Sequence, residues 1–221
     1  MFLEIPEVLN EAEVGRLREL SRQLNFVDGR VSNPANTTKN NLQADVNDPL
    51  FKESVSVVAN GLSRNETFRN FAFPRRVAPP LLCKYSGGMT YGAHADAAFM
   101  VLPNGNYLRS DISCTVWLND PNTYQGGELV IYLQSRAVPI KCPAGWAVVY
   151  PSTQLHEVKP VTSGERLVSI TFIESLIPDA DKRELVYAVN EVAALEGNTI
   201  AWENRMRLQL VAQNLLRMFT T

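Results

Sequence analysis

The spacing of hydrophobic and polar positions changes twice along the chain, and it predicts helices at both ends with a β region between them. Residues 10–24 carry apolar side chains at helical spacing behind Asn10, with Glu13 three residues on, which is the pattern of a capped amphipathic helix. Residues 49–63 repeat the helical spacing. The polar stretch 29–41 between them predicts a surface loop or hairpin edge.

From about residue 71, short apolar runs alternate with Gly, Pro and Asn. The seven runs that predict strands are RRVAPPLLCKYS, DISCTVWLND, GGELVIYL, AVPIKC, GWAVVYP, HEVKPV and RLVSITFIES. No helical pattern separates them, so they indicate a sandwich or barrel and not a parallel sheet with crossover helices. After Pro178 the helical spacing returns, and residues 179–195 and 199–218 predict two helices around a break at Gly197.

These elements predict an α+β protein with a double-stranded β-helix (jelly-roll) core. We expect residues 1–177 to form the jelly-roll domain with its N-terminal helices, and residues 178–221 to form a C-terminal helical extension. The last helix carries an apolar stripe that needs a cover. Two covers fit the pattern: the chain's own sheet, or a second subunit in a homodimer through the C-terminal helices.

Composition narrows the classes of function. The chain has 221 residues, 45% of them hydrophobic, and 21 Lys and Arg against 23 Asp and Glu. This balance does not indicate a nucleic-acid partner. No apolar window is long enough for a membrane helix, and Glu4 and Glu7 stand where a signal peptide would be basic. We therefore expect a cytoplasmic protein with no membrane partner.

The three cysteines fit a reducing compartment. Cys83, Cys114 and Cys142 are an odd number, form no CxxC pair and lie within apolar runs. We interpret them as buried free thiols, in preference to a disulfide or a zinc site.

The chain has only two histidines, and both lie in the β region. His94 belongs to the tripeptide His94-Ala95-Asp96. Residues two apart on an extended segment point the same way, so His94 and Asp96 are candidates to bind one metal. A mononuclear non-haem Fe(II) site needs two imidazoles and one carboxylate, with positions left open for co-substrate and O2. His156, at the end of an apolar run, is the only imidazole left to complete it.

Arg166 supplies a candidate anion site ten residues after His156. If its strand alternates, Arg166 shares a face with Val168, Ile170 and Phe172, which places a guanidinium against an apolar interior. A buried guanidinium needs an anion and suits a carboxylate, such as the 5-carboxylate of 2-oxoglutarate. Taken singly, a histidine at a strand end is usually a surface or core residue, and an arginine that opens a strand is usually solvated. Their joint occurrence in this order favours a site.

The segments that carry these residues resemble a known family. They are Tyr85-Ser-Gly-Gly-Met-Thr-Tyr91-Gly-Ala-His94-Ala-Asp96, Gly126-Gly127-Glu128-Leu129 and Tyr150-Pro-Ser-Thr-Gln-Leu-His156-Glu-Val. Together they resemble the prolyl- and lysyl-hydroxylase-type (PKHD-type) branch of the 2-oxoglutarate and Fe(II)-dependent oxygenases, in particular the bacterial hydroxylases called iron-uptake factors. The resemblance extends over nearly the whole chain.

The resemblance implies a dioxygenase that hydroxylates a C–H bond with release of succinate and CO2. It implies that His94, Asp96 and His156 bind Fe(II), that Arg166 binds 2-oxoglutarate, and that Tyr85 donates a hydrogen bond to the same co-substrate. O2 is the second co-substrate, and ascorbate (vitamin C) is an optional cofactor. The substrate is small or peptidyl: a peptidyl side chain, a free amino acid or a siderophore-like molecule.

Some positions depart from the resemblance or stay open. YLQSRAV after the GGELVI strand and Glu174 in TFIES differ from the expected pattern, at positions that border the substrate mouth. The roles of Lys39, Asn41, Arg109 and Asp111 stay open between a packed or solvated surface and a wall of the site. The alternatives to an enzyme are a jelly roll that senses iron or 2-oxoglutarate without turnover, and a scaffold that binds no metal.

Overall fold

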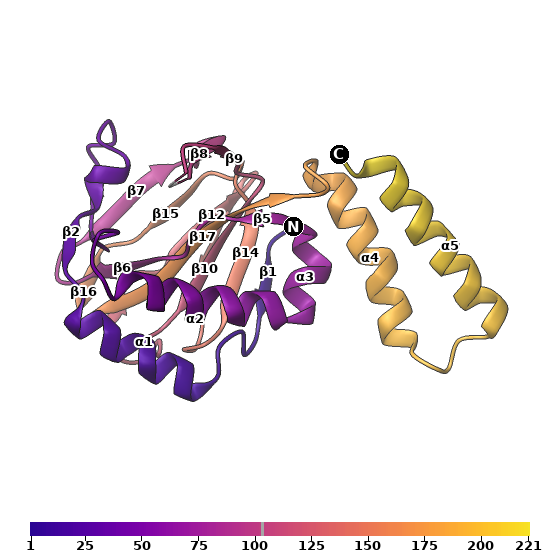
Figure 1. Cartoon of the computed structure of the whole chain (residues 1–221), viewed down its shortest axis with the longest axis horizontal. Coiled ribbons are helices and arrows are strands. Elements are labelled where there is room, and N and C mark those ends of the chain that lie inside the picture. The colour runs from indigo at the N-terminus through magenta and orange to yellow at the C-terminus, as the bar shows by residue number, and fades with distance from the viewer. Residues whose placement is uncertain (103) are drawn as a thin grey trace.

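Two antiparallel sheets face each other in the computed structural model, which describes residues 1–102 and 104–221 (Figure 1). The larger sheet has the strand order β1 (Leu3–Ile5), β14 (Ala147–Pro151), β10 (Ile112–Trp117), β17 (Arg166–Ser175), β6 (Leu81–Tyr85), β4 (Leu42–Ala44) and β2 (Phe26–Asp28), and β5 (Pro74–Val77) also pairs with β17. The smaller sheet has the order β13 (Arg136–Ile140), β12 (Leu129–Leu133), β15 (His156–Val158), β7 (Thr90–His94) and β3 (Lys39–Asn40). Two short ribbons pair β11 (Gln125–Gly126) with β16 (Val161–Ser163) and β8 (Phe99–Val101) with β9 (Tyr107–Arg109). Neighbouring strands come from distant parts of the chain, which confirms the predicted jelly-roll core.

Three helices cover the outer face of the larger sheet. They are α1 (Glu11–Gln23), α2 (Phe51–Arg64) and α3 (Glu66–Ala72). Helix α1 begins as its sequence predicts, because the Asn10 side chain accepts from the Glu13 amide and the Glu13 side chain accepts from the Asn10 amide. A short 3-10 turn, η1 (Gly29–Ser32), follows β2.

Period-two alternation divides the core into two layers. On β10, Cys114 and Val116 pack under the helices, whereas Trp117 packs between the two sheets. Ser113 and Thr115 share the inner face with Trp117. The space between the sheets is therefore apolar at one end and polar at the other, and the polar end holds the residues described below.

The chain ends in a two-helix hairpin that projects from the jelly roll (Figure 1). Helix α4 (Ala180–Glu196) packs against α3, with the rings of Phe71 and Tyr187 in edge contact at 5.3 Å. Helix α5 (Trp202–Phe219) packs on α4. The division of the chain at residue 177 into two domains stays a prediction. No helix of the described residues is long and apolar enough to cross a bilayer.

Several short elements have no counterpart in the sequence prediction. Helix α3 has only 7 residues and is capped by Asn65, so it is too short for helical periodicity to reveal. Strand β7 has the sequence TYGAH, whose glycine and polar residues hide its pairing. All three cysteines are buried and free, as the sequence predicts. Burial raises the pKa of Cys83 to about 11.

Candidate metal and co-substrate site

His94, Asp96 and His156 lie together at one end of the space between the sheets. His94 is the last residue of β7, Asp96 follows two residues later, and His156 opens the neighbouring strand β15. The antiparallel register sets His156 opposite His94. One ligand atom from each of the three side chains lies within 4.8 Å of the others. The fold thus brings together three residues that the sequence singled out.

Both imidazoles are held with Nε2 free. Nδ1 of His94 lies 2.8 Å from the carbonyl oxygen of Gly92, and Nδ1 of His156 lies 2.9 Å from that of Gln154. A carbonyl oxygen can only accept, so in each neutral ring Nδ1 carries the proton and Nε2 presents its lone pair. These Nε2 atoms lie 3.9 Å and 3.6 Å from the carboxylate oxygens of Asp96.

The surroundings of His94 keep its ring neutral and fixed. Burial, together with the charge repulsion of the nearby His156, lowers the pKa of His94 to about 4. Tyr91 stacks on the His94 ring at 3.6 Å between centroids and 16° between planes. Asn33 in turn donates to the Tyr91 hydroxyl at 2.9 Å. A neutral, oriented imidazole is the form that binds a metal ion.

A chain of buried serine hydroxyls ends on Asp96. Ser113 donates to the Asp96 carboxylate at 2.5 Å. Its oxygen lies 2.8 Å from that of Ser152, which accepts from Ser110 at 2.9 Å. Because Ser113 gives its proton to Asp96, Ser152 must donate to Ser113, and all three hydroxyls point their protons toward the carboxylate. None of the three serines is a candidate site residue in the sequence, so the sequence gives no sign of this series of hydrogen bonds.

Arg166 is buried without a protein partner. Its side chain is 2% exposed, and no hydrogen bond or ion pair joins its guanidinium to the described residues, with Nε fully enclosed and unpaired. The guanidinium carbon lies 5.0 Å from the ring centroid of Tyr85, which stands opposite in the strand register. Trp117 Nε1 and the Tyr124 hydroxyl are also buried without partners. A buried cation with no counter-ion indicates room for an anionic ligand.

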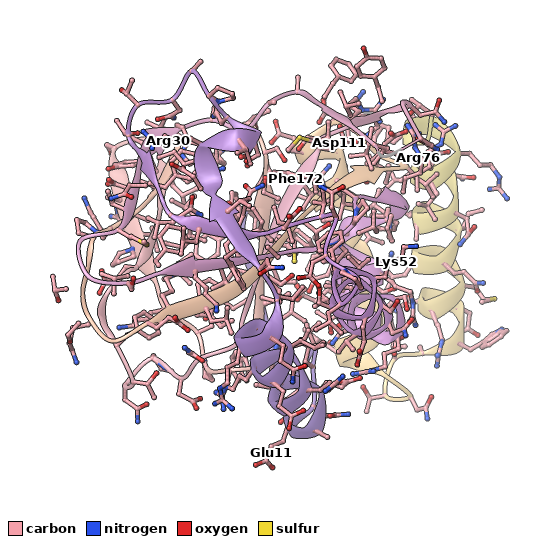
Figure 2. The ribbon with its side chains drawn as sticks, turned by 60° about the vertical axis from the view of Figure 1, so that its left-hand side comes forward. Glu11, Arg30, Lys52, Arg76, Asp111 and Phe172 are labelled. Atoms are coloured by element: carbon pink, nitrogen blue, oxygen red, sulfur yellow. The ribbon has the colours of Figure 1, made fainter. Side chains whose placement is uncertain are left out.

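One cavity joins the metal-ligating group to Arg166. Its lining comprises Tyr85, Tyr91, His94, Asp96, Ser113, Cys114, Thr115, Leu129, Tyr150, His156, Val158, Arg166, Ile170, Thr171 and Phe172. Phe172 is labelled near the middle of the molecule in Figure 2. Arg166, Ile170, Thr171 and Phe172 line the cavity on this strand. Val168 packs between the sheets whereas Leu167 packs under the helices, as the alternation expected of this strand predicts. The inner face of β10, with Ser113 and Thr115, forms one of its walls.

Gly127 is needed where Arg166 enters the cavity. It has φ +69°, and a side-chain carbon at this position would lie 3.0 Å from Arg166 Cδ and 2.8 Å from Val161. Gly127, the second glycine of the Gly126-Gly127-Glu128-Leu129 motif, therefore makes room for the arginine.

The four residues whose roles the sequence left open do not line the cavity. They are Lys39, Asn41, Arg109 and Asp111. Lys39 is buried, donates to Ser32 Oγ at 2.6 Å and lies 5.1 Å from the Tyr91 ring centroid. Asn41 is buried with an unpaired Oδ1. Arg109 and Asp111 form a two-bond ion pair at 2.7 and 3.1 Å.

The two departures from the resemblance also lie outside the cavity. The YLQSRAV segment forms the tight turn between β12 and β13, with a positive φ at Gln134. Glu174 is buried and forms ion pairs with Arg75 and Arg76. Neither position lines the cavity, and the expectation that they border the substrate mouth stays a prediction.

The donor set fits Fe(II) and the arginine fits a dicarboxylate. Two neutral imidazole nitrogens and one carboxylate are the ligands of mononuclear non-haem Fe(II) sites, and they leave positions for further ligands. The unpaired guanidinium of Arg166 in the same cavity fits the far carboxylate of 2-oxoglutarate.

Comparison with known sequences points to the same chemistry. Residues 81–174 match the model of a family described as the 2OG-Fe(II) oxygenase superfamily. A PKHD-type hydroxylase of Sphingopyxis alaskensis is 46% identical over 218 residues, which cover 99% of each chain. The PKHD-type hydroxylase YbiX of Escherichia coli is 37% identical over 220 residues, which cover 98% of each chain.

Solved structures show the same fold at low sequence identity. A prolyl hydroxylase of Trichoplax adhaerens, in complex with a hypoxia-inducible-factor peptide, has a TM-score of 0.61 at 16% identity and covers 83% of this chain and 86% of its own. A Pseudomonas putida prolyl-4-hydroxylase has a TM-score of 0.53 at 17% identity, with 79% and 92% covered.

Proposed function

The chain belongs to the PKHD-type hydroxylases, a group of Fe(II)- and 2-oxoglutarate-dependent dioxygenases, and we propose that its cavity couples the conversion of 2-oxoglutarate to succinate and CO2 with hydroxylation of a substrate C–H bond. One oxygen atom of O2 enters succinate and the other enters the substrate. The observation that carries this proposal is that a buried, unpaired Arg166 and the His94, Asp96, His156 group line one cavity.

We propose that His94, Asp96 and His156 hold the metal. When bound, Fe(II) supplies the O2 chemistry that no side chain can perform. The protein's part is to present two fixed Nε2 lone pairs and one carboxylate, with each ring anchored by a backbone carbonyl. Ser113 holds the Asp96 carboxylate, and the hydroxyls of Ser152 and Ser110 support Ser113.

We propose that Arg166 and Tyr85 bind the 5-carboxylate of 2-oxoglutarate. Burial raises the pKa of the Tyr85 hydroxyl, so this group stays protonated and donates. The guanidinium offers a planar fork of donors. The apolar lining, with Leu129, Val158 and Ile170 among its members, keeps water from the reacting atoms.

Two further features of the proposal concern the setting of the reaction. The cytoplasm is the proposed compartment, which the three buried free cysteines support because a reducing environment preserves thiols. Ascorbate is proposed as a reductant that returns the metal to Fe(II) after turnover without a substrate. Succinate yield with and without ascorbate measures this role.

The proposal is tested by anaerobic loading with Fe(II) and 2-oxoglutarate, followed by O2 and a screen of peptides, amino acids and siderophore-like molecules. A substrate raises succinate release above the background without substrate, and mass spectrometry shows a product heavier by one oxygen atom. His94→Ala and Asp96→Ala are expected to abolish stoichiometric iron binding and to lower turnover by a factor on the order of 1,000.

Glu157→Gln is the matched control, because Glu157 follows His156 on β15 and instead accepts from Tyr132 and pairs with Lys159. This variant should keep both iron and turnover. If His94→Ala keeps stoichiometric iron and succinate release, the proposed ligand set is wrong. If the wild type binds iron and 2-oxoglutarate but releases no succinate in O2, the site senses its ligands and does not catalyse.

A further inference from the structure

The C-terminal hairpin exposes more apolar surface than a helix pair packed on a core should. Of the 18 residues of α5, only Ala212 is buried. On α4, Leu185, Val192 and Leu195 are 50%, 47% and 81% exposed, and on α5 Val211 and Met218 are 46% and 72% exposed. Helix α5 lies farther from the jelly roll than α4 does (Figure 1).

The exposed apolar residues of α4 form one stripe. Leu185, Ala188, Val192 and Leu195 recur at intervals of three and four residues, which places them on one side of the helix. The buried residues of the same helix, Arg183, Val186 and Tyr187, lie on other sides and face the core or α5. The jelly roll that holds α4 therefore cannot also cover this stripe.

Two residues of α5 extend the stripe across the hairpin. Lys182 lies 5.3 Å from the Phe219 ring centroid, which sets the register of the antiparallel pair. Counted from this contact, Met218 is level with Leu185 and Val211 is level with Val192, each to within about 3 Å along the axis. Both helices wind right-handed, so the flank of α5 that carries Val211 and Met218 lies on the same side as the α4 stripe. We call these six residues the hairpin face: Leu185, Ala188, Val192, Leu195, Val211 and Met218.

The charges beside the hairpin face are segregated by helix. Helix α4 carries Asp181, Glu184, Glu191 and Glu196 against Lys182 and the buried Arg183, whereas α5 carries Arg205, Arg207 and Arg217 against Glu203. The three arginines of α5 donate to asparagines and to one backbone carbonyl. No ion pair joins α4 to α5 within the described ranges. Glu184 pairs instead with the N-terminal ammonium group at 2.9 Å. An acidic helix and a basic helix thus stand side by side without an ion pair between them.

We propose that the occupant of the hairpin face is the hairpin face of a second copy of this chain, in a two-fold dimer that forms a four-helix bundle. A two-fold axis parallel to the helices sets α4 of each copy against α5 of the other. This arrangement covers the apolar stripe and brings the acidic helix opposite the basic one. A self-complementary pattern of this kind fits a second copy better than an unrelated partner of one charge.

The size of the face is sufficient. Two helices of 17 and 18 residues are about 26 Å long and together about 20 Å wide. This patch of about 520 Å² per partner is smaller than a standard interface, but it reaches the roughly 500 Å² per partner that is the lower bound for a specific one. The inference does not depend on the catalytic proposal, since the hairpin lies outside the cavity.

The first test is the mass of the full chain by light scattering after gel filtration. The proposal predicts twice the chain mass of 24.6 kDa. Val192→Glu combined with Val211→Glu should give monomers and raise the dimer Kd by roughly 100-fold or more, because charges are forced into the centre of the interface. Far-UV circular dichroism should be unchanged, because both side chains are already about half exposed.

Trp202→Glu is the matched control. Trp202 is 67% exposed and lies nine residues from Val211, which is about 180° around α5. The Trp202→Glu variant loses a larger apolar side chain than either valine change does, but its hairpin face is intact. The variant should therefore still form the dimer. A monomeric wild type at about 100 μM chain, or a dimer that survives the Val192 and Val211 changes, overturns the proposal.

Charge exchange tests the pairing of α4 with α5. Glu191→Lys and Arg207→Glu should each weaken the homodimer, about 10-fold in Kd, because each replaces attraction by repulsion across the interface. Mixing the two variants should restore a dimer that contains one copy of each. If the mixture is no more dimeric than either variant alone, α4 does not face α5 of the partner.

Discussion

The jelly-roll cavity and the junction with the helical hairpin each bury one arginine, and the two are treated in opposite ways. Arg166 and Arg183 are both 2% exposed. Arg183 donates to the carbonyl oxygens of Ile177 and Pro178 at 2.8 and 3.3 Å, so it ties α4 to the end of the jelly roll. Arg166 has no such partner.

The difference separates structural from functional burial. A guanidinium that donates hydrogen bonds to backbone carbonyl oxygens of its own chain stabilises the fold and needs no ligand as a partner. A guanidinium left unpaired costs stability, and the cost is offset when an anion binds. Arg166 should therefore matter to the co-substrate more than to the fold, and Arg183 should show the reverse.

The largest effect is expected at Arg166. Arg166→Met should raise the KM for 2-oxoglutarate by a factor on the order of 100 to 1,000, because a charge-assisted pair is lost at a cost of about 2 to 5 kcal/mol. The Tm of the ligand-free protein should stay level or rise, since an unpaired buried charge is removed. Steady-state succinate release and thermal unfolding measure the two quantities. A lowered Tm with an unchanged KM would place Arg166 with the structural arginines.

Arg183→Met should reverse this pattern. The buried carbonyl oxygen of Ile177 and the partly buried one of Pro178 lose their donor. The free energy of unfolding should therefore fall by about 2 to 3 kcal/mol. The KM for 2-oxoglutarate should match that of the wild type. Urea denaturation and succinate release test the prediction, and a raised KM at unchanged stability would contradict it.

A smaller effect is expected from the serine chain. Ser113→Ala should lower the affinity for Fe(II), or for Co(II) as an air-stable substitute, by about 10-fold, because the carboxylate of Asp96 loses its donor. The matched control is Ser169→Ala on the neighbouring strand, whose hydroxyl is buried without a partner. Metal titration of the two apo variants compares them. Equal affinities would show that Ser113 does not position Asp96.

The smallest effect concerns acid stability. Burial opposes ionisation of Glu174, but hydrogen bonds from the Arg109 amide and the Arg76 side chain outweigh it, and the pKa of Glu174 lies below its ordinary value. A carboxyl group with a lowered folded-state pKa contributes stability above its ordinary pKa and loses that contribution as the pH falls through the folded value. Glu174→Gln should flatten the decline of Tm with acidification between about pH 6 and pH 3. If the Tm of the wild type and of the Glu174→Gln variant declines identically as the pH falls, Glu174 does not contribute to acid stability.

The sequence predicts the parts of the site that depend on local alternation. His94 and Asp96 stand two apart, and Arg166 opens a long alternating strand, so period two alone orients each of them. His156 could be added because it is the only other imidazole. The jelly roll and the terminal helices follow from apolar spacing in the same way.

The remaining features depend on contacts between distant segments. Ser110 and Ser152 are common residues in loops and strand ends, and only the fold turns their hydroxyls toward Ser113. Lys39 lies in a polar stretch that predicts exposure, but β3 pairs with β7 and buries it. The burial of Arg183 likewise follows from the docking of α4, which helical spacing does not specify.

The central claim is that one cavity holds the metal and 2-oxoglutarate together, and calorimetric titration of 2-oxoglutarate into anaerobic protein tests it without knowledge of the substrate. Fe(II)-loaded wild type should bind one 2-oxoglutarate per chain. Removal of the metal by Asp96→Ala, or of the cation by Arg166→Met, should each weaken that binding by a factor on the order of 100. Equally tight binding of 2-oxoglutarate by all three proteins would contradict the account.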